Sequence, residues 1–222
     1  MFAGHVGAGL AIGRMERRLN PGLVVLAALL LDVVLWILVL GGVERATIPA
    51  DYAARRYLLF DFPVSHGMVL AAGWALAAAG AAALVARGGS VRPGRAAAVV
   101  GLAVASHELL DLLVHVPEIP LLGRSSPALG LGLWRVMPVA LAAETAIAFG
   151  GLAWYLRGSD LPTGRRIGLV AVVAVVTALT VAGQTVAPAP PDVGTVAGSG
   201  LVSIAATVAL VGWLGRTRSA GR

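Results

Sequence analysis

The chain has 222 residues, of which 58% are hydrophobic and only 13% are charged, and its mean hydropathy is +0.87. This composition excludes an ordinary soluble globular protein. The chain contains no cysteine, so disulfide bonds and thiolate metal ligands are also excluded, and any metal ion must be held by histidine or carboxylate side chains. The formal net charge of +6 could indicate a nucleic-acid partner, but the arginines are scattered through short connections, and membrane topology explains them better.

Six segments are apolar over the roughly 20 residues that a helix needs to cross the hydrocarbon core of a bilayer. They are Gly22–Gly42, Gly67–Ala86, Ala96–Val116, Val136–Leu156, Ile167–Ala187 and Gly200–Gly215. A shorter apolar segment, residues 2–13, precedes them and ends in arginines, which is the wrong charge order for a cleaved signal peptide. It is too uniformly apolar for an amphipathic surface anchor. The sequence therefore predicts an all-α fold, a polytopic transmembrane helical bundle of about six spans plus a half-inserted N-terminal helix.

We expect one integral membrane domain over residues 1–222, with the half-inserted helix in 1–20, a four-span core with a polar site in 21–156, and two further spans in 157–222. The arginines divide unequally between the two ends of the spans. The larger group, which the positive-inside rule places in the cytoplasm with the C-terminus, is Arg14, Arg17, Arg18, Arg87, Arg92, Arg95, Arg157, Arg165, Arg166, Arg216, Arg218 and Arg222. The smaller group is Arg45, Arg55, Arg56, Arg124 and Arg135.

Several ionisable residues lie inside the apolar segments. Such groups are costly, by about 2.5–3.5 kcal/mol for an Asp at the centre of a membrane helix, so a functional interpretation is the default. His107, Asp111 and His115 follow one another at four-residue intervals and share one helix face. Because the two histidines are about 12 Å apart along the helix axis, either Asp111 joins one of them at a metal ion or it bridges two ions. The alternative is a hydrogen-bonded polar stripe between helices.

Residues from distant parts of the chain are expected at the same depth in the membrane as this stripe. Counting about 1.5 Å per residue from the arginine-rich edge places His5, Asp32 and His107 in one layer, and Glu144 also lies near mid-depth. His66 and the outer residues of the histidine stripe continue this polar column outward. We therefore expect a divalent metal ion, zinc or manganese, with the ligands His5, Asp32, His66, His107, Asp111 and His115. The candidate general bases are Glu144 and Glu108.

Other polar residues have simpler interpretations. Ser65 precedes the second expected span, where an N-cap is a more ordinary role than that of a nucleophile. Glu118, like the other acids of the outer loops, needs no special function. The proline-rich segment 188–192 is expected to be an extended linker before the last span.

Four segments carry a resemblance to a known family. They are Gly4-His5, Leu30-Leu31-Asp32, Ser65-His66 and Ser106-His107-x-x-Leu110-Asp111-x-x-x-His115. Together they resemble the YdjM-like group of bacterial inner-membrane proteins, which are regarded as metal-dependent hydrolases, and the similarity extends to about residue 150. The resemblance implies a bacterial inner-membrane location and an intramembrane metal site, with the ligands His5, Asp32, His66, His107 and Asp111.

The chain departs from the pattern of that family in two places. The usual Pro-Asp-x-Asp is Leu31-Asp32-Val-Val, and the usual His-Arg-Gly-x-Thr-His is reduced to Val64-Ser65-His66-Gly67. These departures remove one aspartate and one histidine. A two-metal site would therefore need His115 and Glu144 as substitutes.

Two functions fit these observations. The first is a membrane-embedded metal-dependent hydrolase that acts on a lipid-like or other membrane-resident substrate. The alternative is a non-enzymatic metal- or proton-binding membrane protein, either a transporter or a structural partner. A transport path requires polar groups on both sides of mid-membrane, whereas the expected cytoplasmic half of these spans is apolar, which favours a one-sided site. The expected partner is the lipid bilayer, and the oligomeric state is left open.

Overall fold

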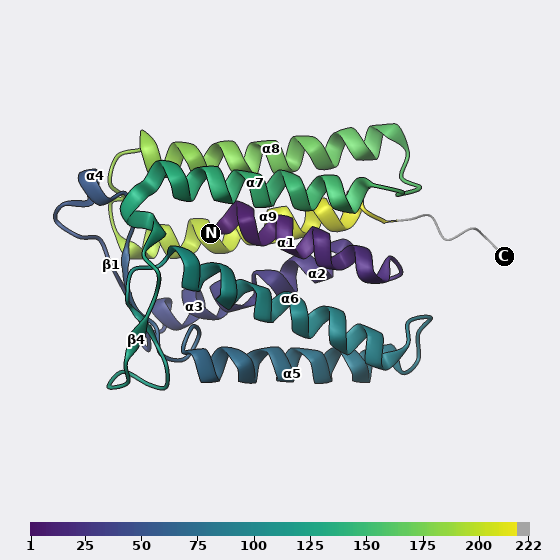
Figure 1. Ribbon diagram of the computed structural model, residues 1–222, viewed down its shortest axis with the longest axis horizontal. Coiled ribbons are helices and arrows are strands. Elements are labelled where there is room, and N and C mark those ends of the chain that lie inside the picture. Colours follow the sequence, from purple (N-terminus) through teal and green to yellow (C-terminus); the bar gives the residue numbers. More distant parts are fainter. Residues whose placement is uncertain (217–222) are drawn as a thin grey trace.

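The long helices of the computed structural model, which describes residues 1–216, run side by side along the longest axis of the molecule (Figure 1). Within the described residues, five helices are long and apolar enough to cross a membrane. They are α5 (Met68–Ala86), α6 (Pro93–Val114), α7 (Met137–Leu156), α8 (Thr163–Thr185) and α9 (Val193–Leu214). This arrangement confirms the predicted all-α fold, a helical bundle of candidate membrane spans.

The first expected span is bent rather than continuous. It consists of α2 (Pro21–Ala28) and α3 (Leu30–Leu40), which meet at Leu29 with an angle of 54°. Neither glycine nor proline stands at the break, so this bend could not be predicted from the sequence. Counted as one span, this pair brings the number of candidate spans among the described residues to six. Broken helices are tolerated at membrane depth where the freed backbone groups are buried in protein.

The N-terminal segment forms α1 (Phe2–Gly13), which begins near the middle of the bundle and runs to one end (Figure 1). Its 12 residues give a length of about 18 Å, roughly half that of the long helices. The other helices bury most of it, and the exposed fraction of His5, Val6 and Leu10 is 0%. The prediction of a short helix that enters only half of the bundle is therefore confirmed, and an amphipathic surface anchor does not fit this burial.

Glycines let α1 approach its neighbours closely. A Cβ atom on Gly7 would overlap the backbone of Ile147 and Ala148 in α7, and one on Gly151 would overlap the backbone of Gly7. Without a strong hydrophobic effect inside a bilayer, such close backbone packing is a main source of helix association. The position of α1 therefore depends on the absence of side chains at the α1–α7 crossing.

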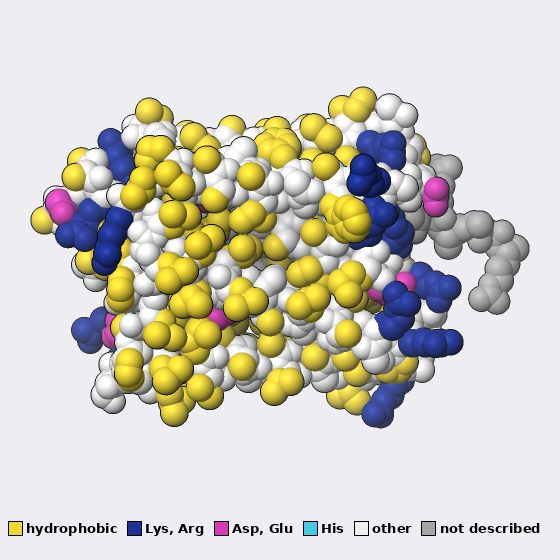
Figure 2. Space-filling view, viewed as in Figure 1, with side chains coloured by type: hydrophobic (Ala, Val, Ile, Leu, Met, Phe, Trp, Pro, Cys, Tyr) yellow, Lys and Arg dark blue, Asp and Glu magenta, His cyan; other side chains and the backbone are white. Residues whose placement is uncertain are grey.

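The connections at one end of the bundle carry the described members of the larger arginine group, and this end is called the arginine-rich end below. It holds the loops that follow α1, α5 and α7 and the end of α9. In Figure 2, basic side chains gather at both ends of the molecule and hydrophobic side chains cover the region between them. Arg218, Arg222 and the C-terminus, for which a cytoplasmic location was predicted, lie outside the described residues.

Two arginines join α1 to the end of α7. Arg14 donates to the carbonyl oxygens of Trp154, at 2.6 Å, and of Arg157, while Arg17 donates to those of Tyr155 and Arg157 at 3.2 and 3.0 Å. These carbonyl groups lie at the C-terminal end of α7. Carbonyl groups at this end of a helix have no hydrogen-bond partner within the helix and carry a partial negative charge. The hydrogen bonds of Arg14 and Arg17 therefore hold the short η1 helix (Arg14–Glu16), which follows α1, against the end of α7.

The opposite end is covered by two irregular segments, residues 43–66 and 117–136, together called the cap. The cap contains β1 (Arg45–Thr47), α4 (Tyr52–Arg55), β2 (Leu59–Asp61), β3 (Ile119–Pro120), β4 (Ala128–Leu129) and η2 (Leu133–Val136). Strand β1 pairs with β2 and β3 pairs with β4, both antiparallel, and an ion pair at 2.9 Å between Asp61 and Arg124 joins the two segments. These small sheets were not expected from the sequence, which showed only loops here.

The last connection leads into α9 through residues 188–192, which form no regular structure, as expected of a proline-rich linker. Asp192 is the N-cap of α9, where its side chain accepts hydrogen bonds from the backbone nitrogen and the hydroxyl of Thr195 at 2.7 and 2.8 Å. These hydrogen bonds lower the pKa of the Asp192 carboxyl below its usual value.

The α1–α7 crossing gives a test of the fold. We expect Gly151→Ala to lower the unfolding temperature in detergent, because the added methyl group overlaps the Gly7 backbone; overpacking of this kind costs typically 1–3 kcal/mol. The matched control is Gly150→Ala on the same helix, where a Cβ atom meets nothing within 4 Å. Equal unfolding temperatures for the two variants would contradict the close crossing.

Candidate metal centre

The predicted histidine stripe lies on α6 and at its end. His107 and Asp111 are one turn apart, and the His107 Nε2 atom lies 3.2 Å from Asp111 Oδ2. His115 is the C-cap residue, and its extended backbone lets the ring turn back toward the same oxygen, at 3.5 Å. The two histidines therefore approach the same carboxylate oxygen, although helix spacing alone placed them about 12 Å apart along the axis.

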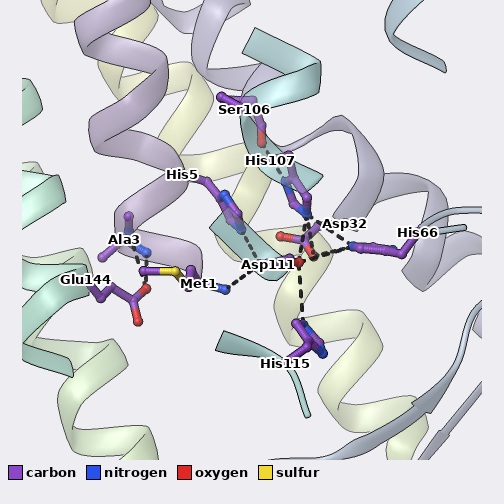
Figure 3. A network of polar contacts seen from close by, with 12 residues as sticks. Met1, Ala3, His5, Asp32, His66, Ser106, His107, Asp111, His115 and Glu144 are labelled. Atoms are coloured by element: carbon purple, nitrogen blue, oxygen red, sulfur yellow. Dashed lines mark hydrogen bonds and ion pairs between the residues drawn. The ribbon is translucent and has the colours of Figure 1, made fainter. Parts of the chain in front are cut away.

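His66 reaches this site from the turn before α5. Its Nε2 atom lies 3.1 Å from His107 Nε2 and 3.5 Å from Asp111 Oδ2. The turn is tight at Gly67, where a Cβ atom would overlap the carbonyl oxygen of Pro63. His66, His107 and Asp111 thus form a triangle of possible ligand atoms (Figure 3), with edges of 3.1, 3.2 and 3.5 Å.

The second oxygen of Asp111 is held by the N-terminal helix. His5 Nε2 lies 3.0 Å from Asp111 Oδ1, and the amino group of Met1 lies 3.4 Å from it. The His5 ring also stacks on the His107 ring, with centroids 3.8 Å apart and an angle of 9° between the planes. Asp111 Oδ1 therefore contacts α1, while Oδ2 faces the other three histidines.

The Nδ1 atom of His107 is bound to the broken span. It donates a hydrogen bond of 2.7 Å to the carbonyl oxygen of Ala28, the last residue of α2. A carbonyl oxygen can only accept, so the proton of a neutral His107 ring is on Nδ1. The lone pair of Nε2 then points to the triangle, and the break at Leu29 leaves the Ala28 carbonyl in position to fix this tautomer.

His66 is fixed by a chain of two residues in the cap. Ser65 Oγ donates to Glu44 Oε2 at 2.7 Å and lies 2.8 Å from His66 Nδ1. Because the hydroxyl proton is used toward the carboxylate, Oγ accepts from His66 Nδ1–H, and the Nε2 atom of a neutral ring has no proton. The interpretation of Ser65 as an N-cap was wrong: Gly67 occupies that position, and Ser65 orients the histidine instead.

His115 is fixed in the same way. Its Nδ1 atom donates to Glu118 Oε1 at 2.7 Å, and the other oxygen of Glu118 accepts from the backbone nitrogen of Phe60 at 2.9 Å. Glu118, for which no special function was expected, therefore connects the end of α6 to β2. Carboxylate and carbonyl partners on the second nitrogen are typical of metal-binding histidines.

These hydrogen bonds leave lone pairs facing a carboxylate at the centre of the site. The Nε2 atoms of His66, His107 and His115 all lie 3.2–3.5 Å from Asp111 Oδ2, and none has a proton when its ring is neutral. Acceptors that face one another in a buried site repel unless a cation lies between them. A metal ion or a bound proton would remove this repulsion.

Two groups of side chains could hold a metal ion within the described part of the chain. They are the buried group His66, His107 and Asp111, and the group His5, Asp32 and His107, which shares His107 and in which Asp32 is partly exposed. Ligands at about 2.0–2.2 Å from one tetrahedral ion lie about 3.3–3.6 Å apart, close to the triangle edges. Asp32 is more distant, since its Oδ1 atom lies 3.8 Å from His107 Nε2 and 4.0 Å from His66 Nε2. Its side chain is 20% exposed, whereas that of Asp111 is 3% exposed.

The two candidate bases lie outside both groups. Glu144 is buried, but its Oε1 atom accepts hydrogen bonds from the backbone nitrogens of Ala3 and Gly4 at 2.9 and 3.3 Å, at the beginning of α1. In Figure 3 it faces Ala3, apart from the histidines. Glu108 is also buried, and within the described residues its carboxylate has no hydrogen-bond partner. Within the described residues, neither carboxylate therefore has a hydrogen bond to the triangle.

A cavity of about 780 Å³ borders the site. Asp32, His66, Asp111 and His115 contribute to its wall, and the remaining wall is mostly apolar and comes from α3, α8, α9 and the cap. Toward the arginine-rich end the site is closed, because Leu10 of α1 and Val24 and Val25 of α2 have an exposed fraction of 0%. Access is therefore from the cavity.

Glu44, which was not expected to belong to the site, is 1% exposed and accepts hydrogen bonds from the backbone nitrogens of Val64 and Ser65. It follows the glycines that end the first span, and nothing in its sequence context differs from an ordinary loop acid. Glu118 was also missed, although its spacing of three residues from His115 is a signal that could have identified it.

The chain matches no family model, and comparison with curated proteins and with solved structures also found no match. The site is therefore interpreted from its own geometry.

The Glu44–Ser65–His66 chain predicts a measurable effect on metal affinity. We expect Ser65→Ala to weaken metal binding, because the His66 ring loses the partner that fixes its tautomer; loss of such a partner costs roughly 10–100-fold in affinity. The control is Ser106→Ala on α6, whose hydroxyl donates to the Ala103 carbonyl in its own helix. Competition with a chelator measures both, and equal affinities would exclude an orienting role of Ser65.

Proposed function

We propose that the protein is a membrane-embedded metal-dependent hydrolase, with zinc or manganese held by His66, His107 and Asp111. One observation carries the proposal: three histidines direct their Nε2 atoms to the carboxylate of Asp111 in a buried site, at 3.2–3.5 Å. The YdjM-like resemblance agrees with it.

The donor set fits such an ion. Two imidazole nitrogens and one carboxylate oxygen are ligands that zinc, manganese and iron accept, and three protein ligands leave a coordination position free. A divalent cation held by these residues would lower the pKa of a bound water molecule and polarise a carbonyl group. His5 acts as a positioning residue, since it holds the second oxygen of Asp111 and stacks on His107.

In this proposal Asp32 is the general base, in place of Glu144 or Glu108. It is near the triangle and is partly exposed to the cavity, so that it can reach both a water molecule and a substrate. Asp32 accepts a proton from water while the water oxygen forms a bond to the carbonyl carbon of an ester. The bond from that carbon to the ester oxygen breaks, and Asp32 returns the proton to the leaving oxygen, giving a carboxylic acid and an alcohol.

The closed arginine-rich side favours hydrolysis over transport. A transport path needs an aqueous or polar route on both sides of the site, whereas apolar residues of α1 and α2 pack without exposure on one side. Non-enzymatic binding of a metal ion or a proton is the alternative. Metal content and turnover of variants distinguish it from hydrolysis.

Metal analysis tests the ligands. We expect the protein, purified in detergent, to contain metal in stoichiometric amount, and the double variant His107→Ala, Asp111→Ala to have lost it because two corners of the triangle are missing. Ser106→Ala, at a position adjacent to His107, is the control and should keep the metal. Stoichiometric metal in the double variant would refute the site, and a metal-free wild-type protein that still folds would favour proton binding.

The base is tested by turnover. We expect Asp32→Asn to abolish the release of fatty acid from phospholipid, because the amide cannot accept the proton, while metal content stays unchanged. Glu144→Gln should retain activity, since Glu144 contacts only the start of α1 in this proposal. Loss of metal from Asp32→Asn would make Asp32 a ligand, and loss of turnover in Glu144→Gln alone would return the role of base to Glu144.

A further inference from the structure

The cavity beside the metal centre is long and mainly apolar. Its walls include one face each of α8 and α9, together with Leu35 and Trp36 of α3. From Val196 to Leu210 along α9 it extends over about 21 Å, at 1.5 Å per residue. One leaflet of a bilayer core of about 30 Å is about 15 Å thick, so the cavity has room for one acyl chain.

The cavity is open toward the surface of the bundle. Val175 and Leu179 of α8 and Val202 of α9 belong to its wall, yet they are 57%, 68% and 69% exposed. In a membrane-spanning bundle these side chains face hydrocarbon. A lipid chain can therefore enter sideways from the bilayer without crossing water.

The cap end of the cavity carries a cationic side chain. Arg56 is the only arginine in the cavity wall formed by the described residues, and it forms no ion pair there. One of its nitrogens donates to the Ala187 carbonyl at 2.8 Å, which leaves other N–H groups for a ligand. The backbone of Arg56 has a φ of 65°, and no other described residue except glycine has a positive φ. This left-handed conformation is unfavourable for a residue with a side chain, and such conformations are common at binding sites.

A second donor lies between Arg56 and the metal centre. Trp134 is 7% exposed and forms part of the cavity wall, and its Nε1–H group has no hydrogen-bond partner among the described residues. Its ring stacks with Tyr57, the neighbour of Arg56, at 5.4 Å, and lies 4.1 Å from the ring of His115. A buried indole N–H normally finds an acceptor, so this group indicates a polar ligand.

We propose that the cavity binds one acyl chain of an anionic membrane lipid, with the ester beside Asp32 and the anionic headgroup on Arg56. The proposal rests on the proposed function and specifies its substrate class. Beyond Asp32 and Asp111 at the metal centre, the part of the wall that the structure describes has no acidic side chain. A zwitterionic headgroup would therefore bring a cation that finds no acidic partner in this part of the cavity wall.

Lipid binding tests the proposal without turnover. Protein freed of lipid in detergent is mixed with phosphatidylglycerol or with phosphatidylcholine of the same chains, and native mass spectrometry measures the bound lipid. We expect preference for phosphatidylglycerol. Arg56→Gln should remove the preference, with binding of phosphatidylglycerol weaker by at least about tenfold. Arg55→Gln is the control, because Arg55 is exposed and pairs with Asp51 at 2.7 Å.

A second pair of variants tests the acyl chain. Gly183 forms part of the cavity wall, and a Cβ atom there meets nothing within 4 Å, so Gly183→Leu should fill the cavity without disturbing the fold. We expect it to abolish binding of both lipids, whereas Gly198→Leu, at a position that is equally open but outside the cavity wall, should bind normally. Equal binding of the two lipids by the wild-type protein, or normal binding by Gly183→Leu, would overturn the proposal.

Failure of the lipid-site proposal can be distinguished from failure of the hydrolase proposal. His107→Ala should still bind phosphatidylglycerol, because the cavity and Arg56 are intact. Lipid that is bound selectively but never cleaved would refute the hydrolase and support the lipid site. Hydrolysis by Gly183→Leu at the wild-type rate would refute the lipid site and leave the hydrolase in place.

Discussion

The carboxylate of Asp111, 2% exposed at the centre of an apolar bundle, is the constraint on which the rest of the site depends. A buried negative charge is very costly unless it is paired and hydrogen-bonded. Four histidines from three segments of the chain surround this carboxylate, and a cation among them would balance the charge. The same contacts join α1, α6 and the turn before α5 at mid-depth, so the stability of the bundle and the geometry of the site have one origin.

Two unusual helices make this convergence possible. The short helix α1 begins inside the bundle, which brings His5 to the level of Asp111, and glycines at its crossing with α7 allow the close approach. The break between α2 and α3 leaves the Ala28 carbonyl in position to accept from His107. A helix end and a helix break leave backbone polar groups without partners, which is unfavourable in contact with lipid. Here the surrounding helices bury both.

The cap and the cavity determine how the site meets its surroundings. Glu44 and Glu118 belong to the cap and orient two of the histidines, so the cap is part of the site rather than a simple connection between spans. The cavity joins the open face of the site to the apolar flank of α8 and α9, while the opposite side is closed by packed residues. A site with one entrance, in contact with hydrocarbon, suits chemistry on a molecule that resides in the bilayer.

The sequence by itself determined the helices and the layer of the site. About 20 consecutive apolar residues suffice to predict a span, and the fixed rise per residue places His5, Asp32 and His107 at one depth. Only the tertiary structure decided which groups meet within that layer, because hydropathy and depth carry no information about the lateral arrangement of helices. Glu144 thus shares the depth but faces the start of α1, whereas Glu44, an ordinary loop acid by sequence, reaches His66 through Ser65 because the cap folds back over the bundle.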